Sequence, residues 1–334
     1  MENVEKKIDF LGFGDIVTDA FILLKEAEIE YDDAKSEKKL CMSFGDKIPY
    51  ESVEVVPAVG NSTNAAVSAH RLGLNSAIVT HIGDDDNGRE CLEQLEKEGI
   101  NTEFVTTQKG EETNYHYVLR FKDERTILVK HHLYDYNFPN IAIPPRWIYL
   151  SSLAENSLPY QQQIADYVEA HPETKMVFQP GTFQIKIGYE KLKKIYKNSE
   201  LFFCNKEEAQ RILGTFNKDI KDLLIGLRNL GPKIISITDG PNGAYAYDGT
   251  DIWFGPMYPD PRPPISRTGA GDAFSSTFTS AIILGKSIPE ALQWAPINSM
   301  SVVQQIGAQK GLLTLAQLEK YLAEAPADYK PKKL

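Results

Sequence analysis

Two kinds of hydrophobic segment alternate along most of the chain. Short runs of consecutive apolar residues are typical of parallel strands that are buried on both faces. Such runs lie at residues 8–14, 77–82, 147–150, 175–178, 201–204 and 233–238. Apolar residues at helical spacing occur at residues 63–72, 88–98, 160–170, 206–213, 220–230, 269–284, 289–305 and 314–324. This alternation predicts an α/β fold in which a doubly wound, mainly parallel sheet is flanked by helices.

Two stretches interrupt the alternation. Residues 40–56, with a turn near Gly45 and Asp46, predict one β-hairpin. Residues 114–131, with a turn near residues 123 and 124, predict a second hairpin. Neither stretch has a helix to cover it, so we expect the two hairpins to pair into one small sheet.

This small sheet would form a lid on the main domain. The lid would consist of residues 39–57 and 112–132. The main α/β domain would be discontinuous and would comprise residues 1–38, 58–111 and 133–334. The polar tail that starts at Pro326 is expected to be loose.

Composition and charge limit the kinds of partner. The net charge is −10 and no basic block offsets it, so neither nucleic acid nor a membrane surface is expected as a partner. Cys41, Cys91 and Cys204 form no CxxC pair and leave an odd count, which favours a cytoplasmic location over a disulfide framework or a zinc site. Aromatic and β-branched residues of the second hairpin need cover on one face, which a partner or a bound substrate would provide, and we expect a homodimer through the lid sheets.

The strongest candidate for chemistry is the start of the helix predicted near residue 269. Gly269, Ala270 and Gly271 allow the backbone to turn so that successive N–H groups point at one spot, where the helix dipole favours an anion. Asp272, in the first helical turn, would then handle a hydroxyl proton beside a bound phosphate. A tight turn followed by an N-terminal helix carboxylate is the plainer interpretation of the same residues.

Residues 267–274, Arg-Thr-Gly-Ala-Gly-Asp-Ala-Phe, resemble the signature of the ribokinase-like (PfkB) carbohydrate kinases. In that family the aspartate is the catalytic base and the preceding backbone amides form an anion hole. The resemblance is collinear over most of the chain. It implies ATP-dependent phosphorylation of a hydroxyl on a small sugar, with Asp272 as the general base, an anion hole at Gly269, Ala270 and Gly271, and Mg²⁺-bound ATP.

Two further segments resemble the sugar-binding motifs of the family. Asp19 ends the segment 14–19 and looks like the carboxylate that binds sugar hydroxyls. Gly60 and Asn64 belong to the segment 60–64, which is similar to the glycine-rich substrate motif. The resemblance therefore implies that these three residues bind the substrate. Turn and helix-cap chemistry is the alternative interpretation of both segments.

Asn205 and Glu208 match the family's Asn-x-x-Glu element, which arranges water around the magnesium ion. Both side chains would face the same way on a first helical turn, and oxygen donors suit a hard cation that keeps its waters. An N-cap with its capping-box partner is the alternative interpretation, and the two interpretations are compatible.

The nucleotide site is implied by weaker similarities. Thr238, Gly240 and Gly243 resemble the family's Thr-x-Gly-x-x-Gly turn, which lines that site. Residues 307–309, Gly-Ala-Gln, resemble a late turn beside the adenine and cation sites. Relatives often carry an asparagine eleven residues before that glycine. This chain has Pro296 there, which leaves Asn298, two positions later, as the candidate.

The chain departs from the family pattern in two other places. The family usually has two glycines where this chain has Val59 and Gly60, so a stiffer lid hinge is expected. Ser266 and Arg267 replace the Asp-Thr that usually opens the signature, and the lost carboxylate helps hold a monovalent cation in related kinases. Potassium dependence is therefore open, and our hypothesis is that Arg267 supplies the fixed positive charge instead.

Two other functions remain open at this point. The same scaffold also phosphorylates nucleosides, so a nucleoside kinase is one alternative. A catalytically silent protein that binds a sugar or a nucleotide is the other. The pair His131 and His132 is not expected to chelate a metal, because neighbouring residues on a strand face opposite sides.

Overall fold

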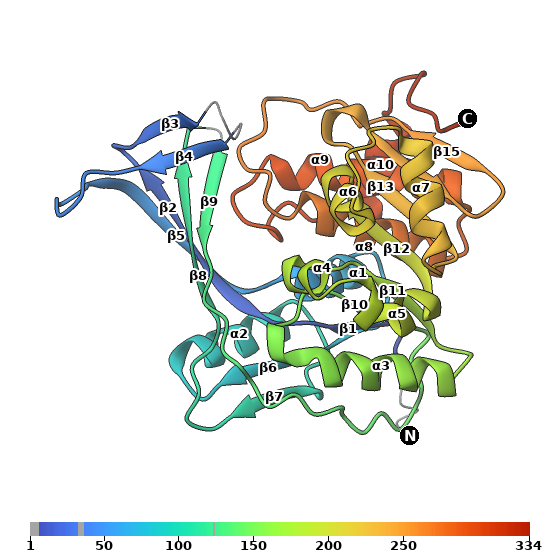
Figure 1. Cartoon of the computed structure of the whole chain (residues 1–334), viewed down its shortest axis with the longest axis horizontal. Helices are drawn as coiled ribbons and strands as arrows, with labels where there is room; N and C mark the ends of the chain where they lie inside the picture. The colour runs from blue at the N-terminus through green and yellow to red at the C-terminus, as the bar shows by residue number, and fades with distance from the viewer. Residues whose placement is uncertain (1–6, 33–36, 123) are drawn as a thin grey trace.

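The computed structural model describes residues 7–32, 37–122 and 124–334. Its body is a mainly parallel sheet with helices on both faces, and a smaller sheet projects from one side (Figure 1). The strands of the large sheet are β1 (Phe10–Phe13), β6 (Ser76–Gly83), β7 (Val105–Gln108), β10 (Trp147–Leu150), β11 (Lys175–Phe178), β12 (Ser199–Asn205), β13 (Ile234–Thr238), β14 (Ala244–Tyr247), β15 (Ile252–Gly255) and β16 (Lys332–Lys333). Their order is β16-β15-β14-β13-β12-β11-β10-β1-β6-β7, and the neighbours from β13 to β7 are parallel.

Helices cover both faces because the strands are apolar on both sides. Along β1, Phe10 belongs to one hydrophobic core and Leu11 to the other. The first core is covered by α1 (Asn61–Arg71), α2 (Asp86–Lys97), α8 (Ala270–Ile283), α9 (Ile288–Val303) and α10 (Leu315–Ala323). The second is covered by α3 (Leu158–Ala170), α5 (Tyr189–Asn198), α6 (Lys206–Leu213) and α7 (Ile220–Asn229).

The predicted fold class is therefore confirmed. Each predicted strand overlaps an observed one, and the runs at 147–150 and 175–178 coincide with β10 and β11 at both ends. Each predicted helix is also found, and no end differs by more than two residues. In the body, the patterns missed the short helix α4 (Thr182–Ile187), helix α5, the parallel strand β7 and the antiparallel strands β14 to β16.

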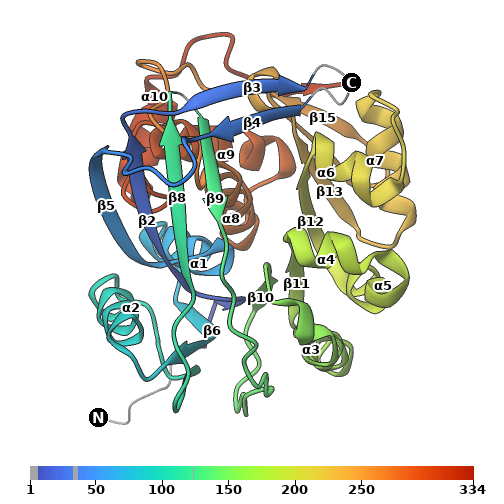
Figure 2. The same ribbon diagram turned by 60° about the vertical axis from the view of Figure 1, so that its left-hand side comes forward.

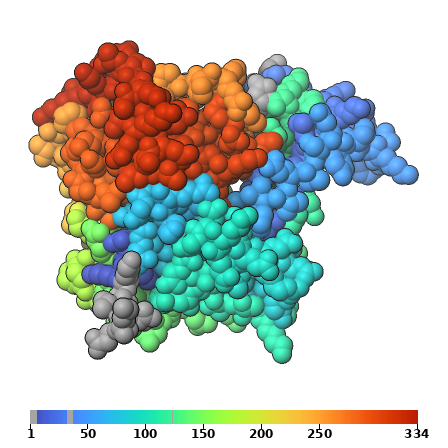
Figure 3. Space-filling model, turned by 180° about the vertical axis from the view of Figure 1, so that it is seen from behind, coloured from blue at the N-terminus to red at the C-terminus, as the bar shows by residue number. Residues whose placement is uncertain are grey.

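We call the smaller sheet the lid, after its expected role. Its strands are β2 (Val17–Leu24), β5 (Tyr50–Val59), β8 (Tyr115–Phe121) and β9 (Glu124–Leu128), in the order β5-β2-β8-β9. Strands β8 and β9 pair antiparallel, so the second hairpin prediction is confirmed; part of its turn lies outside the described residues. The foot of the lid packs against α2 and α1. The lid strands rise from there in Figure 2, and the blue part of the chain extends from the body as an arm in the space-filling view (Figure 3).

The hairpin predicted at residues 40–56 is wrong. Strand β5 pairs with β2, whereas β4 (Glu37–Cys41) pairs with β3 (Glu28–Asp32) in a separate ribbon. Strand β2 carries buried apolar residues along most of its length, and its backbone needs neighbours on both sides. Apolar alternation shows that a segment is a strand but does not select its partner. The division into a main domain and a lid at the expected boundaries stays a prediction.

The expectation of a loose tail from Pro326 is also wrong. Tyr329 is buried, and its hydroxyl donates to the carbonyl of Gln293 at 2.7 Å. Strand β16 then adds to the edge of the large sheet beside β15. Within the described part of the chain, no helix combines the length and the apolar character needed to cross a bilayer.

Candidate active site

A pocket of about 940 Å³ opens between the lid and the carboxyl ends of strands β10 to β13. This edge of a parallel sheet is where α/β proteins usually bind ligands. Most of the residues singled out in the sequence line this pocket. They are Asp19, Gly60, Asn64, Asn205, Glu208, Thr238, Gly240, Gly269, Gly271 and Asp272.

The backbone turns sharply where α8 begins. Gly269 has a φ of 83°, and a Cβ atom there would lie 2.4 Å from the Cβ of Ala308, so only glycine fits. Gly271 is exposed and opens toward the pocket. The first N–H groups of a helix have no partner inside the helix, and its dipole favours an anion there. The start of α8 is therefore suited to hold a phosphate.

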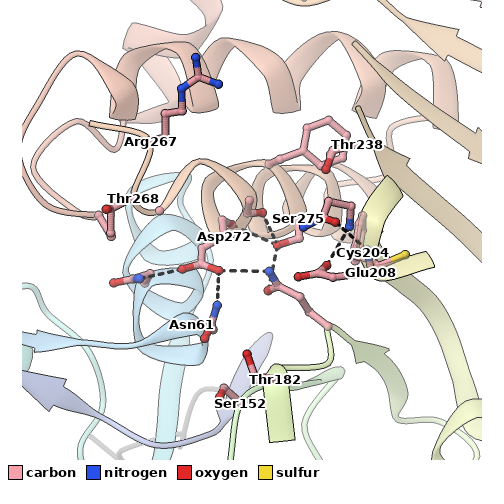
Figure 4. Close-up of a pocket in the computed structure, with 18 of the residues that line it drawn as sticks. Asn61, Ser152, Thr182, Cys204, Glu208, Thr238, Arg267, Thr268, Asp272 and Ser275 are labelled. Carbon is pink, nitrogen blue, oxygen red and sulfur yellow. Dashed lines mark hydrogen bonds between the residues drawn. The ribbon is translucent and has the colours of Figure 1, made fainter. Parts of the chain in front are cut away.

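Asp272 lies just inside this cradle and accepts three amide hydrogen bonds (Figure 4). Its Oδ1 accepts from Asn61 Nδ2 at 2.7 Å and from Gln179 Nε2 at 3.1 Å. Its Oδ2 accepts from Asn64 Nδ2 at 2.8 Å. Burial raises the pKa of Asp272, the three amides oppose this, and Asp19 adds to the rise. A buried carboxylate with a raised pKa and fixed oxygens is what a general base requires.

Helix α1 supplies two of these donors because of how it begins. Gly60 precedes it with a φ of 120°, and a Cβ atom at Gly60 would lie 2.4 Å from the carbonyl oxygen of Asp15. With Gly60 in this conformation, Asn61 and Asn64 face Asp272 from the first turn. Gly60 therefore serves the geometry of the pocket, whichever ligand the pocket binds.

The lid contributes an unsatisfied polar cluster at the other end of the pocket. Asp19 Oδ1 lies 3.4 Å from His116 Nδ1. Within the part of the chain that the structure describes, Asp19 Oδ1 and His116 Nε2 are buried without any hydrogen-bond partner. Buried polar groups are normally satisfied, so these atoms in the pocket are available to bond with water or with a polar ligand.

His131 belongs to the same cluster. Its Nδ1 lies 3.6 Å from Asp15 Oδ2 and has no hydrogen-bond partner among the described residues, and its ring lies 5.1 Å from that of His116. The expectation that His131 lies on a strand is wrong, because β9 ends at Leu128. The two neighbouring histidines do diverge, since His132 contacts Glu112 and not the pocket.

Asn205 and Glu208 form the capping box that the sequence allowed. Glu208 N donates to Asn205 Oδ1 at 2.8 Å, and Asn205 N donates to Glu208 Oε2 at 2.9 Å. Burial raises the pKa of Glu208, and the nearby Asp272 adds to this rise. Among the described residues, no cluster of three or more acidic, histidine or cysteine side chains could hold a metal. The one free oxygen of Glu208 fits a magnesium ion that is held mainly by phosphates and water.

A second cavity of about 330 Å³ adjoins the pocket at the other side of the cradle. The cavity is lined by Ala270 of the cradle and by Thr238, Gly240 and Gly243, the three residues that the sequence assigned to the nucleotide site. Its remaining lining is largely apolar and includes Met257, Pro264, Pro296, Met300 and Val303. An apolar cavity lined by a few polar groups is of the kind that binds small molecules, and a nucleotide site here stays a prediction.

The prediction that Asn298 lines the nucleotide site does not agree with the structure. Asn298 is fully buried, donates to Thr277 Oγ1 at 2.8 Å and accepts from Leu313 N at 2.9 Å. It points into the core between α8 and α9, while Pro296 and Ser299 reach the cavity. On a helix, a shift of two positions turns a side chain to another face, so Asn298 cannot replace an asparagine at position 296.

Arg267 lies on the loop before α8 and borders both cavities. Burial raises the pKa of nearby Asp260, and the charge of Arg267 opposes that rise. The arginine is therefore a fixed positive charge next to the cradle, as the hypothesis requires. Whether it replaces a monovalent cation stays a prediction.

Sequence reasoning missed Asn61, Gln179, His116 and His131. Asn61 lies inside a segment that was singled out, and Gln179 directly follows β11, where polar residues at strand ends are a usable signal. The two histidines have no local signal, because they reach Asp19 and Asp15 only through the pairing of β2 with β8 and the path of the chain after β9.

Comparison with known proteins gives a consistent result. The model of the pfkB family carbohydrate kinases matches residues 28–315. An uncharacterized sugar kinase of Archaeoglobus fulgidus is 26% identical over 252 residues, which cover 72% of this chain and 96% of that protein. A ribokinase of Bacillus subtilis is 26% identical over 292 residues, which cover 84% of this chain and 92% of that protein.

The solved structures agree on the fold. The crystal structure of a nucleoside kinase of Methanocaldococcus jannaschii, an archaeal member of the ribokinase family, has a TM-score of 0.78. It is 20% identical, and the match covers 95% of this chain and 99% of that one. At this identity the likeness concerns the fold, which is ribokinase-like, as the sequence implied.

Proposed function

Because the chain belongs to the pfkB family of carbohydrate kinases, which transfer phosphoryl groups to alcohols, we propose that Asp272 is the general base in the transfer of the γ-phosphoryl group of ATP to a small sugar. One observation carries the proposal. The Asp272 carboxylate is buried at the mouth of the glycine cradle, and three neutral amides fix its oxygens. It is thus within reach of both a hydroxyl and a phosphate in one pocket.

The lid end of the pocket would bind the acceptor. Asp19 would accept hydrogen bonds from sugar hydroxyls through Oδ1, which has no hydrogen-bond partner among the described residues. His116 and His131 would offer further buried nitrogen atoms for hydrogen bonds to the sugar. Gly60 lines the pocket at the start of α1, and Asn64 would face the sugar beside Asp272. The bound hydroxyl would then be directed at Asp272, which takes its proton as the O–P bond forms.

The cradle end would bind the phosphates. Amide groups at Gly269, Ala270 and Gly271 receive the negative charge that develops on the transferred group. A magnesium ion, held through water by Asn205 and Glu208, would neutralise charge between the phosphates of bound ATP. The turn at Thr238, Gly240 and Gly243 and the apolar cavity behind it would bind the nucleoside part of ATP.

The test is a direct assay of phosphoryl transfer from ATP to a panel of sugars and nucleosides. Formation of ADP and a phosphorylated sugar in equal amounts supports the proposal. Transfer to nucleosides alone would select the alternative, a nucleoside kinase.

One observation favours this alternative. Phe183 contacts His131 edge to face in the pocket wall, with ring centroids 5.6 Å apart, and offers an aromatic surface to a nucleobase.

The lid also supports a proposed homodimer. Three half-exposed apolar side chains lie in one row across the sheet: Val55, Tyr117 and Leu128. The row follows from strand pairing, because Val55 pairs with Ala20, Ala20 with Tyr117 and Tyr117 with Leu128. Asp19 is adjacent to Ala20 on β2, so this row lies on the face away from the pocket. Light scattering at micromolar concentration should give twice the chain mass, and Tyr117→Lys should halve it. A parent protein with the mass of one chain would contradict this part of the proposal.

A further inference from the structure

The side chain of Gln309 connects two parts of the site that are far apart in the chain. Gln309 is buried, and its backbone carbonyl accepts from Arg71 Nη1 at 2.8 Å, which holds the residue in place. Its amide nitrogen Nε2 donates to the carbonyl oxygen of Ala58 at 2.7 Å and to Asn64 Oδ1 at 3.0 Å. Both hydrogens of this amide are therefore used.

The second of these bonds determines which way Asn64 faces. The two ends of an asparagine amide have the same shape, but one donates and the other accepts. Gln309 can only donate from Nε2, so it holds Asn64 Oδ1 on its own side and leaves Nδ2 to donate to Asp272 Oδ2. We propose that Gln309 is a positioning residue, which fixes the orientation of Asn64 and thereby keeps an amide donor on the catalytic carboxylate.

The first bond anchors this arrangement at the base of the lid. Ala58 lies in β5 with a φ of 57°, an uncommon conformation for a residue other than glycine. Its N–H donates to Cys91 Sγ at 3.2 Å, and its carbonyl accepts from Gln309. A chain of hydrogen bonds thus links lid strand β5 to the catalytic carboxylate, from Ala58 through Gln309 and Asn64 to Asp272.

The surroundings of Asp272 make the donor from Asn64 important. Among the described residues, the titratable groups that face this carboxylate are Asp19 from β2, Glu208 from α6 and Tyr149 from β10. None of these supplies a positive charge, so the three side-chain amides are the hydrogen-bond donors that oppose the effect of burial. If Asn64 turned its carbonyl toward Asp272, the pKa of the carboxyl would rise further.

The test compares Gln309→Leu and Gln309→Glu with a matched control in the full-length protein, and it rests on the proposed role of Asp272. Leucine removes both donors. Glutamate keeps size and polarity but can only accept, so it should reverse Asn64. The control is Gln304→Leu, because Gln304 is equally buried but lies away from Asp272. Its Oε1 accepts from Arg262 Nε at 2.9 Å, and its Nε2 donates to the backbone carbonyl of Arg262 at 3.0 Å.

We expect Gln309→Leu to lower kcat about tenfold and to move the acidic limb of kcat/KM up by about one pH unit, the effect of one hydrogen bond. Gln309→Glu should move the acidic limb further up in pH. In both Gln309 variants, KM for ATP should stay within about twofold of the parent value. Gln304→Leu should lose about as much thermal stability as Gln309→Leu but keep the acidic limb of the parent protein. The Glu variant keeps the comparison valid if the Leu variant does not fold.

Two outcomes separate the inference from the function on which it rests. If both Gln309 variants keep the parental acidic limb while Asp272→Asn is nearly inactive, Gln309 is only structural and the inference is overturned. If Asp272→Asn itself stays within a few-fold of the parent, the proposed base is wrong, and the role of Gln309 is wrong with it.

Discussion

The two ends of the pocket are built in different ways. The cradle end is made by consecutive residues, since Gly269, Gly271 and Asp272 all belong to the start of α8. The lid end is made by residues far apart in the chain, since Asp19 and His116 meet only because β2 and β8 pair in parallel. The cradle end would handle the phosphoryl group, which is the same in every such kinase, while the lid end would contact the acceptor.

This difference explains what can be read from one sequence. A positive φ, a close backbone approach and a helix N-terminus are encoded by adjacent residues and appear as a motif. Strand pairing depends on competition among all the strands, so alternating apolar residues leave the partner open. The lid end is therefore harder to predict from one sequence than the cradle end.

The largest effect should come from the cradle end. Asp272→Asn removes the proton acceptor but keeps the shape of the side chain, so kcat should fall by about 10²- to 10⁴-fold with the fold intact. Steady-state kinetics and circular dichroism would check this. Glu207→Gln is the matched control, because Glu207 lines the same pocket and loses the same charge. If both variants lose activity equally, net charge and not the base explains the loss.

A smaller effect should follow from filling the cradle. Gly269→Ala places a methyl group against Ala308 and should lower kcat by about 10- to 100-fold and stability by about 2–4 kcal/mol. Gly285→Ala is the control, because Gly285 has a φ of 84° but no atom within 4 Å of an added Cβ. It should cost only about 1 kcal/mol in urea unfolding. Equal losses in the two variants would show that Ala308 does not restrict position 269.

The lid end should affect binding more than chemistry. His116→Ala removes a buried group that faces Asp19, so KM for the acceptor should rise about tenfold while KM for ATP stays within about twofold. His132→Ala is the matched control, since His132 contacts Glu112 outside the pocket. An equal rise in both KM values would indicate a general disturbance of the lid.

The smallest effect concerns the cation. If Arg267 supplies the fixed positive charge, kcat should differ by less than about twofold among sodium, potassium and a large organic cation at equal ionic strength. Strong activation by potassium would contradict the hypothesis and would indicate a cation site that forms without the usual carboxylate.

Much of the body and the cradle could be predicted from the sequence. Buried strands such as β10 and β11 appear as apolar runs, and α6 begins where Asn205 and Glu208 signal a cap. Asn298 was misjudged because a two-residue shift on a helix changes the face. His131 was misjudged because the end of β9 was not visible in the pattern.

The role of Asp272 as the base can be tested through the pH profile of kcat/KM. Because the pKa of Asp272 is raised by burial, the ionised form is lost as pH falls through a value above that of an ordinary aspartate. If Asp272 is the base, the parent protein should lose activity along an acidic limb above pH 4, and this limb should be absent from the residual activity of Asp272→Asn. An acidic limb that is unchanged in the variant would show that another group is the base.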